Sequence, residues 1–286
     1  MKRTLIFLLG FCTTLSYAQN DSITLVTAPW ASKIIAPGLT HKQFHFAEGS
    51  LFCSSQFINI LEIEANSQRE IEIFPSPVLI ETSNLAKERG AFAAVNGSFF
   101  KFNYEHNILD YNSVDYIRKD NTLLAPNTYT SNSRAMHQQG ALAIYNGVLY
   151  ILKADALKNW ESYIQAQEII TSGPLLRVAG VDEKLENSTF YTTRHPRTAI
   201  AKRENGNIIL FTVDGRAKES AGMSLEELQK TLRWLGAKDI INLDGGGSTT
   251  MFILGATENG VVNHPTDNRL FDNNGERRVA NIILVK

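Results

Sequence analysis

The sequence contains little cysteine, no long apolar run after its first residues, and no excess of one charge. Its two cysteines are Cys12 and Cys53, and only Cys53 remains if an N-terminal leader is removed, so an intrachain disulfide is excluded. A lone cysteine of this kind is usually buried and inert, and we expect the same of Cys53. The 28 basic and 29 acidic residues do not cluster by sign, which argues against nucleic acid as a partner.

Two cofactor patterns are also missing. No Cys/His spacing indicates zinc, and the glycine run at residues 245–247 is not followed by the lysine of a P-loop. We therefore expect no required cofactor. No stretch after the N-terminal region is long enough to form a transmembrane segment.

The first residues are typical of an export signal. Lys2 and Arg3 precede an apolar run over residues 5–15, which is too short to span a bilayer, and Ser16-Tyr17-Ala18 resembles a signal-peptidase site. We expect cleavage after Ala18 at the end of a signal peptide over residues 1–18. The mature protein would then be exported to the periplasm or the extracellular space.

The rest of the chain divides into two parts by pattern. Residues 19–83 contain short apolar strands with polar breaks and are interpreted as an N-terminal β-rich extension of the sheet. Residues 84–286 are interpreted as the main domain. Within it, residues 101–139 are polar with little periodicity, which is typical of a functional loop or an insertion. Residues 140–152 predict a hairpin that turns at Asn146-Gly147.

The clearest pattern is a strand, a helix and a strand near the C-terminus. A strand over 207–213 ends at Asp214, a capping box at Ser224 begins a helix with a leucine stripe, and a strand over 239–243 ends at Asp244. These lengths predict a crossover between parallel strands. Together with the hairpins they predict an α+β fold: a mixed, largely antiparallel sheet with packed helices and one C-terminal βαβ crossover.

This crossover predicts that Asp214 and Asp244 lie close together. Parallel strands joined by one helix end at the same edge of a sheet, where ligand sites of such sheets are usually found. Two carboxylates at that edge would suit acid–base or nucleophilic chemistry at an acetal carbon. Capping of a turn by each aspartate is the structural alternative. With carbonyl oxygens of the following glycines, the same carboxylates could instead hold a calcium ion.

Glycines and cations gather near the same elements. Gly245, Gly246 and Gly247 permit close approach of the backbone to a ligand and could point N–H groups at an oxyanion. Arg216 lies two residues after Asp214, within reach of the proposed crevice, and arginine forks suit phosphate oxygens. His195 is a candidate proton shuttle, although a lone histidine is more often structural.

Several motifs resemble the phosphodiester glycosidase family, in the family's order. They are Val95–Phe99, Thr171–Leu176, Arg197–Ala199, Val213–Arg216, Asn242–Met251 and Arg278–Asn281. The resemblance extends from about residue 91 to the C-terminus. It implies a glycoside hydrolase that cleaves the sugar–phosphate bond of a glycosyl 1-phosphodiester, such as an N-acetylglucosamine 1-phosphodiester, and the export signal predicts that this enzyme is secreted.

The resemblance and the residue chemistry together assign roles to the candidates. One of Asp214 and Asp244 attacks the anomeric carbon or activates water there. Arg197 and Arg216 stabilise the departing phosphate, together with the glycine run. The other residues expected to bind substrate are Asn96, Ser98, Ser172, His195, Ser248 and Arg278.

Two other functions stay open at this point. A metal-dependent phosphodiesterase would break the P–O bond instead of the C–O bond. A non-catalytic glycan-binding protein of the cell envelope would use exposed aromatic rings, for which Tyr104, Tyr111 and Tyr116 are candidates. Packing of the polar loop onto the sheet is the simpler explanation for these tyrosines.

Overall fold

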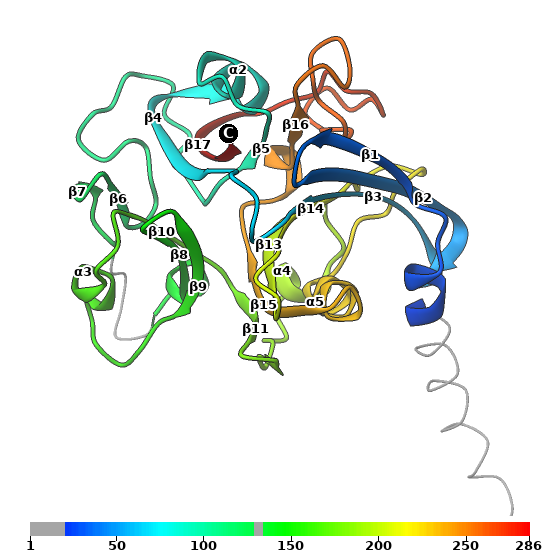
Figure 1. Ribbon diagram of the computed structural model, residues 1–286, viewed down its shortest axis with the longest axis horizontal. Helices are drawn as coiled ribbons and strands as arrows, with labels where there is room; N and C mark the ends of the chain where they lie inside the picture. The colour runs from blue at the N-terminus through cyan, green and yellow to red at the C-terminus, as the bar shows by residue number, and fades with distance from the viewer. Residues whose placement is uncertain (1–20, 129–133) are drawn as a thin grey trace, which may run out of the picture.

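The computed structural model describes residues 21–128 and 134–286, so the expected export signal lies outside the described residues. The described chain is built mainly from antiparallel sheets, with few helices (Figure 1). The largest sheet has the strand order β1-β2-β3-β14-β13-β15-β11-β12. Its strands are β1 (Ala31–Ala36), β2 (Leu39–Leu51), β3 (Ser54–Ile63), β11 (Leu175–Val178), β12 (Val181–Asp182), β13 (Arg197–Arg203), β14 (Ile208–Val213) and β15 (Ala237–Asn242).

Two smaller sheets pack against the largest one. The five-stranded sheet, in the order β7-β6-β10-β8-β9, consists of β6 (Ile117–Lys119), β7 (Thr122–Ala125), β8 (Gly140–Tyr145), β9 (Val148–Lys153) and β10 (Glu168–Ser172). The four-stranded sheet, in the order β16-β5-β17-β4, consists of β4 (Ile71–Glu81), β5 (Ala93–Asn96), β16 (Met251–Ile253) and β17 (Arg278–Val285). The α-helices are α2 (Thr82–Glu88), α3 (Trp160–Tyr163), α4 (Thr189–Thr192) and α5 (Leu225–Trp234), with short 3-10 turns η1 (Met136–Gln138) and η2 (Gly246–Ser248).

Strand β14 is buried on both faces, which explains its unbroken apolar sequence. Ile208 and Leu210 pack into a core between the three sheets. Ile209 and Phe211 face the opposite side and pack into a second core with helix α5. A strand with one solvent-exposed face would alternate apolar and polar residues, whereas this strand contributes to two cores.

Helix α5 begins as predicted, at a capping box. The Ser224 hydroxyl accepts a hydrogen bond from the N–H of Glu227 at 3.2 Å, and the Ser224 N–H donates to the Glu227 carboxylate at 2.9 Å. Leu225, Leu228 and Leu232 are fully buried against the sheet. The prediction of this helix from its cap and its leucine stripe is confirmed.

Helix α5 connects β14 to β15, which are not neighbours in the sheet. Both strands pair antiparallel with β13, which lies between them. They therefore run in the same direction and end at the same edge, next to the start of β13 (Figure 1). The largely antiparallel sheet is confirmed. The mixed sheet is not found, because each strand pairing within the described residues is antiparallel.

The N-terminal strands belong to the same sheets as the rest of the chain. Strand β3 pairs with β14, and β4 pairs with β17. Cys53 is exposed, so the expectation of a buried cysteine is wrong. It occupies the tight turn between β2 and β3 with Phe52, and both residues adopt positive φ angles.

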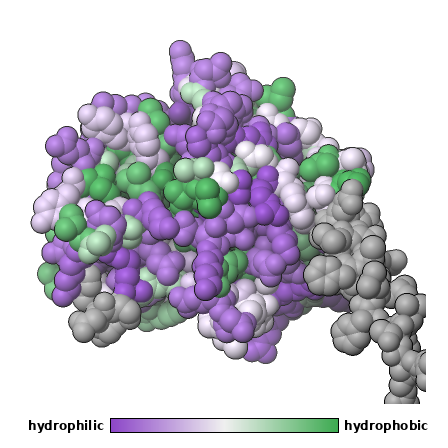
Figure 2. Space-filling view, turned by 90° about the horizontal axis from the view of Figure 1, so that it is seen from below, coloured by the Kyte–Doolittle hydropathy of each residue, from purple (hydrophilic) through white to green (hydrophobic). Residues whose placement is uncertain are grey.

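Hydrophobic surface gathers on the side that carries the five-stranded sheet, whereas hydrophilic surface covers most of the rest of the face shown (Figure 2). Exposed side chains of this sheet include Leu123 of β7 and Val148 of β9. Among residues 21–128 and 134–286, no helix has the length and apolar character required to cross a membrane.

Candidate active site

The candidate site lies at the edge where β14 and β15 end. Asp214 directly follows the last residue of β14, and Asp244 is the second residue after the end of β15. Backbone hydrogen bonds fix the two strand ends to their neighbours: the Asp214 N–H donates to the Phe57 carbonyl at 3.0 Å, and the Asp244 N–H donates to the Gly97 carbonyl at 3.1 Å. The predicted motifs therefore meet at one edge of the largest sheet.

The two aspartates nevertheless have separate surroundings. Val213 packs in the core with α5, whereas Leu243 packs in the core between the sheets. The residues that precede the two aspartates thus point to opposite sides of the sheet. No hydrogen-bond partner is common to the Asp214 and Asp244 carboxylates in the described part of the chain.

Asp214 is almost fully buried and accepts hydrogen bonds at both oxygens. The Asn263 amide donates to Oδ1 at 3.0 Å, and the backbone N–H of His264 lies 3.1 Å from each oxygen. The His264 ring nitrogen Nδ1 lies 2.7 Å from Oδ2. Asp214 therefore fixes the position of His264 and leaves its Nε2 as the nitrogen available to a ligand.

Aromatic contacts hold the His264 ring from two sides. The Phe271 ring stacks on it with centroids 3.8 Å apart and an interplanar angle of 12°. The Phe57 ring meets it edge-on at 4.7 Å. A ring that is clamped by two neighbours and oriented by a carboxylate resembles the oriented histidines of acid–base sites.

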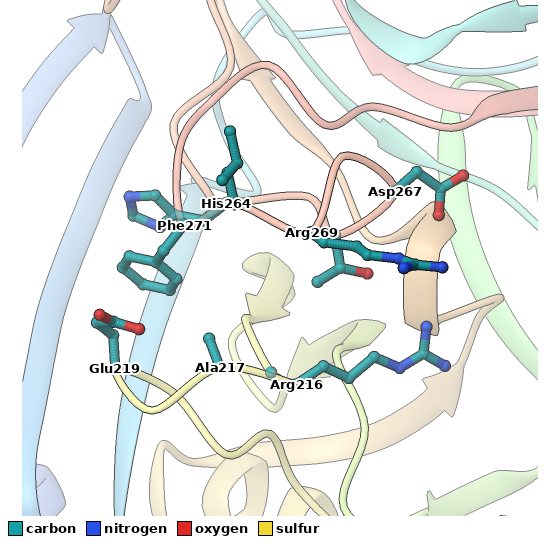
Figure 3. A pocket seen from close by; sticks show the side chains of 10 residues that line it. Arg216, Ala217, Glu219, His264, Asp267, Arg269 and Phe271 are labelled. Carbon is teal, nitrogen blue, oxygen red and sulfur yellow. The ribbon is translucent and has the colours of Figure 1, made fainter.

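His264 lines a pocket, called here the first pocket, with a volume of about 630 Å³. Its walls are the segments 215–219 and 264–271 (Figure 3). Arg216 and Arg269 reach into it from these two facing segments, and their guanidinium groups extend toward the end where Asp267 lies. Paired guanidinium groups on facing loops are suited to holding a phosphate between them.

Asp244 lies beside this pair of loops. Its Oδ1 accepts a hydrogen bond from the Gly245 N–H at 2.8 Å. Burial raises the pKa of Asp244 to about 6, against the opposing effects of hydrogen bonds from Ser248 and Gly245 and of the charges on Arg277 and Arg216. A carboxyl group that titrates near 6 beside cationic side chains is a candidate base or nucleophile.

The glycine turn, residues 245–247, brings cations close to Asp244. A Cβ on Gly246 would lie 2.9 Å from a guanidinium nitrogen of Arg216. A Cβ on Gly247 would lie 2.1 Å from the carboxylate of Asp267 and 2.2 Å from the guanidinium of Arg277. The missing side chains therefore make room for two arginines against the turn.

The N–H groups of this turn do less than predicted. The Gly245 N–H is used by the Asp244 carboxylate, and the Gly246 N–H is used by the Pro196 carbonyl. Since these two donors are engaged within the protein, the arginines are better placed than the turn to bind an anion.

Gly247→Ala is expected to reduce activity while the protein stays folded. The added Cβ would displace the ends of two flexible side chains, Asp267 and Arg277, and would move a positive charge away from Asp244. We expect kcat/KM to fall by about tenfold. Because the charge of Arg277 lowers the pKa of Asp244, the acidic limb of the pH–rate profile should move to higher pH. Full activity and an unchanged profile in a folded variant would contradict this role.

Several predicted site residues are buried and bonded inside the protein. The Asn96 amide donates to the Asp244 carbonyl at 2.7 Å and so supports the turn. The Ser98 hydroxyl donates to the Thr171 carbonyl at 2.6 Å, and the Ser172 hydroxyl donates to the Asn242 carbonyl at 3.0 Å. These contacts indicate positioning roles.

Arg197 is also engaged by the backbone. Its guanidinium donates to the carbonyls of Met223, Phe190 and Thr193 at 2.8 to 3.0 Å. Burial, together with the nearby charge of Arg216, lowers the pKa of Arg197 to about 10. The Arg197 side chain therefore connects the backbone segments of Phe190, Thr193 and Met223, and it is not one of the residues that line the first pocket as described.

The remaining candidates differ in their position. The buried Nδ1 of His195 has no hydrogen-bond partner among residues 21–128 and 134–286. The pKa of His195 is lowered by burial and then by the nearby charges of Arg197 and Arg216. Arg278 bonds to Glu81 at 3.0 Å on the exposed surface, away from the carboxylates. Its neighbour Arg277 is the arginine that reaches the glycine turn.

The arrangement does not favour calcium between the two aspartates. Asp214 is occupied by N–H donors, and Asp244 faces two guanidinium groups, so the carboxylates do not converge on one cation. Within residues 21–128 and 134–286, no group of three or more His, Cys, Asp or Glu residues could hold a metal ion.

Sequence reasoning missed His264, Asn263, Asp267 and Arg269. All four lie between β16 and β17, in a segment with many bends and turns and no periodicity. Of the tyrosines considered for glycan binding, Tyr116 is buried and accepts a hydrogen bond from Arg118, whereas Tyr104 is exposed.

These features of the site are typical of one class of protein. A carboxylate of raised pKa, a histidine held by a second carboxylate and facing guanidinium groups are the equipment of a hydrolase that acts on a phosphate ester. The phosphodiester glycosidase family is matched over residues 89–286, and the chain belongs to this family of hydrolases.

Known relatives agree with this assignment. The chain is 30% identical to mouse N-acetylglucosamine-1-phosphodiester alpha-N-acetylglucosaminidase over 155 residues, which is 53% of the chain and 26% of that protein. It is 25% identical to the bovine protein of the same name over 218 residues, or 70% of the chain and 38% of that protein. The chain thus spans less than half the length of these relatives.

Solved structures show the same fold. The catalytic domain of the zebrafish N-acetylglucosamine-1-phosphodiester alpha-N-acetylglucosaminidase, auto-inhibited by its pro-peptide, superposes with a TM-score of 0.65 at 18% identity and covers 87% of this chain and 84% of its own. A putative exported protein of Burkholderia pseudomallei gives a TM-score of 0.52 at 16% identity, with coverage of 83% and 75%.

Proposed function

We propose that this protein is exported and hydrolyses the sugar–phosphate bond of a glycosyl 1-phosphodiester, of which an N-acetylglucosamine 1-phosphodiester is the model substrate. The observation that carries the proposal is the first pocket, where Arg216 and Arg269 face each other between His264 and the turn that holds Asp244. Family membership and the names of the relatives support the same reaction.

In this reaction the bond between the anomeric carbon and the phosphate oxygen breaks. The bond's electron pair goes to the phosphate, whose charge grows from −1 to −2, and an oxygen from water ends on the anomeric carbon. A phosphate monoester is a weakly basic leaving group, so cations that stabilise its growing charge matter more than full protonation. Arg216 and Arg269 supply two such charges.

Asp244 acts at the anomeric carbon in this proposal, as nucleophile or as the base that deprotonates water. Its raised pKa keeps it reactive near neutral pH, and its ionised form predominates above about pH 6. His264, oriented by Asp214, can donate a hydrogen bond from Nε2 to the part of the substrate that extends along the first pocket from the phosphate.

The test is hydrolysis of an N-acetylglucosamine 1-phosphodiester in ¹⁸O-labelled water by the wild-type protein and the Asp244→Asn variant. The proposal expects label in the released sugar, an unlabelled phosphomonoester, and loss of turnover in the variant. Label in the phosphate, with activity lost on chelation, would instead establish a metal-dependent phosphodiesterase. Binding of glycans without turnover of any sugar 1-phosphodiester would establish a binding protein. The anomer released first, read by NMR, separates a nucleophilic from a basic role of Asp244.

A further inference from the structure

A second pocket, with a volume of about 440 Å³, adjoins the first pocket. His264 and Phe271 line both pockets, so the two cavities meet at this pair of stacked rings. The remaining walls come from strands β1, β2 and β3 and from residues 256–273. A pocket of this size is in the range that binds small ligands or one unit of a larger one.

The second pocket adjoins the first pocket at the end opposite to the guanidinium groups. His264 and Phe271 lie at one end of the first pocket, and the guanidinium groups of Arg216 and Arg269 extend toward the other (Figure 3). A ligand with its phosphate between the guanidinium groups would have to extend past the stacked rings to reach the second pocket.

The lining of the second pocket suits a saccharide. Ser32 and Gln43 offer a hydroxyl and an amide group to sugar hydroxyls. Thr257 and Asn273 also line the pocket, and because they donate to the carbonyls of Val261 and Asn263 they chiefly offer their oxygens as acceptors. Among the described residues that line the pocket, none is an aspartate or a glutamate. The absence of acidic groups makes the pocket compatible with a ligand that carries a phosphate nearby.

Aromatic and cationic groups add to this chemistry. The rings of Phe57 and Phe271 flank the pocket and can pack against the apolar face of a sugar ring. Lys33 lines the pocket from β1 and makes no ion pair within the described residues. Its charge would favour a phosphate-bearing chain.

The second pocket is also connected to the loop that carries Arg216. The His45 ring, which lines the second pocket, lies 2.8 Å from the Glu219 carbonyl in the wall of the first. The Phe57 N–H is bonded to the Ser220 hydroxyl at 2.9 Å. Strands β2 and β3 thus line the second pocket and hold the loop that forms one wall of the first pocket.

We propose that the second pocket binds the glycan on the leaving side of the phosphodiester, one or more sugar units beyond the phosphate. This proposal rests on the proposed function, because it names the substrate class of that same site. The strands that supply Lys33, Gln43 and Phe57 precede the part of the chain matched by the family, residues 89–286. Specificity for the leaving glycan would therefore be set outside that part.

The experiment compares three N-acetylglucosamine 1-phosphodiesters whose leaving phosphomonoesters are methyl phosphate, glucose 6-phosphate, and maltotriose phosphorylated at a primary hydroxyl. The test variant is Lys33→Ala/Gln43→Ala. The matched control is Lys42→Ala, next to Gln43 on β2, where Lys42 pairs with Glu62 instead of lining the pocket. Thermal unfolding of each variant checks that it is folded.

For the wild type, we expect kcat/KM to be about tenfold higher with the maltotriose substrate than with the methyl substrate. The double variant should lose most of this gain, while its rate with the methyl substrate and the rates of the control stay unchanged. Equal losses with all three substrates, or no loss with any, would overturn the proposal.

A failure of the proposed function would be seen separately, as absence of turnover of all three substrates by the wild type. The subsite is then tested by calorimetry with maltotriose phosphate and with inorganic phosphate. Weaker binding of maltotriose phosphate by the double variant, at least fivefold, with equal binding of inorganic phosphate, supports the subsite. Equal binding of both ligands by wild type and variant overturns it.

Discussion

Asp244→Asn is expected to lower kcat/KM by about 10³-fold or more while the fold is preserved. The asparagine oxygen can still accept the hydrogen bond that the Gly245 N–H donates to Asp244 at 2.8 Å. The variant therefore removes the charge and the basicity with little change in shape. Steady-state kinetics with an N-acetylglucosamine 1-phosphodiester, at saturating and at low substrate, measure the loss.

The pH dependence tests the same residue independently. Burial raises the pKa of Asp244 from an ordinary value of 3.8 to about 6, and the ionised form is the reactive one in the proposed mechanism. The wild-type kcat/KM should therefore rise about tenfold per pH unit below 6 and become level above it. The residual activity of Asp244→Asn should not show this rise of kcat/KM with pH below 6. A wild-type profile that is flat between pH 5 and 8 would contradict the assignment.

The same substitution is expected to stabilise the protein. A folded-state pKa above the unfolded value means that ionising Asp244 costs folding free energy; the cost is absent below about pH 4 and complete above about pH 6. The shift from 3.8 to about 6 corresponds to at most about 3 kcal/mol. Urea unfolding at pH 7.5 should show Asp244→Asn to be more stable than wild type, and the difference should vanish near pH 4. A variant that is less stable at both pH values would show that the carboxylate is a structural group.

Asp214→Asn is expected to have the opposite effect on stability, although the chemical change is identical. Both oxygens of Asp214 accept hydrogen bonds, from Asn263 and from the backbone and ring of His264. An amide would present its own N–H groups to one of these donors, which should cost roughly 2 kcal/mol of folding free energy. It would also remove the carboxylate that orients the His264 ring, and kcat should fall about 10²-fold.

A double-mutant cycle separates a joint role from two independent ones. If Asp214 acts through His264, then Asp214→Asn/His264→Gln should be about as slow as His264→Gln alone. Multiplication of the two single losses would show that the residues act separately. Urea unfolding of all three variants ensures that losses of activity are measured on folded protein.

Much of this site could be predicted from the sequence, and the limits have physical causes. The capping box of Ser224 and the apolar strands on either side fix the helix between Asp214 and Asp244, so their shared sheet edge follows from local pattern. The separation of the two carboxylates does not. It depends on which core Val213 and Leu243 enter, and strands buried on both faces carry no alternation that would reveal this.

The missed residues lie where the chain has no periodic structure. His264 and Arg269 stand in a loop whose course is set by contacts with distant segments, such as the bonds of His264 to Asp214. The sequence also could not show whether Arg277 or Arg278 reaches the site. Adjacent residues that enter a strand point to opposite sides, and only the position of the glycine turn selects Arg277.

The pairing of β3 with β14 has a consequence for how far this chain can be shortened. A fragment limited to residues 89–286 would contain the segment matched by the family, but β14 would become a bare sheet edge of six apolar or β-branched residues, Ile208–Val213. Such an edge is a template for pairing between molecules, so the fragment should aggregate. It would also lose the Ser55 carbonyl that accepts from Ala221 and the Phe57 carbonyl that accepts from Asp214. The match to the family therefore lies in residues 89–286, whereas a paired edge for β14 and the positions of Asp214 and Ala221 depend on β3, which precedes this segment.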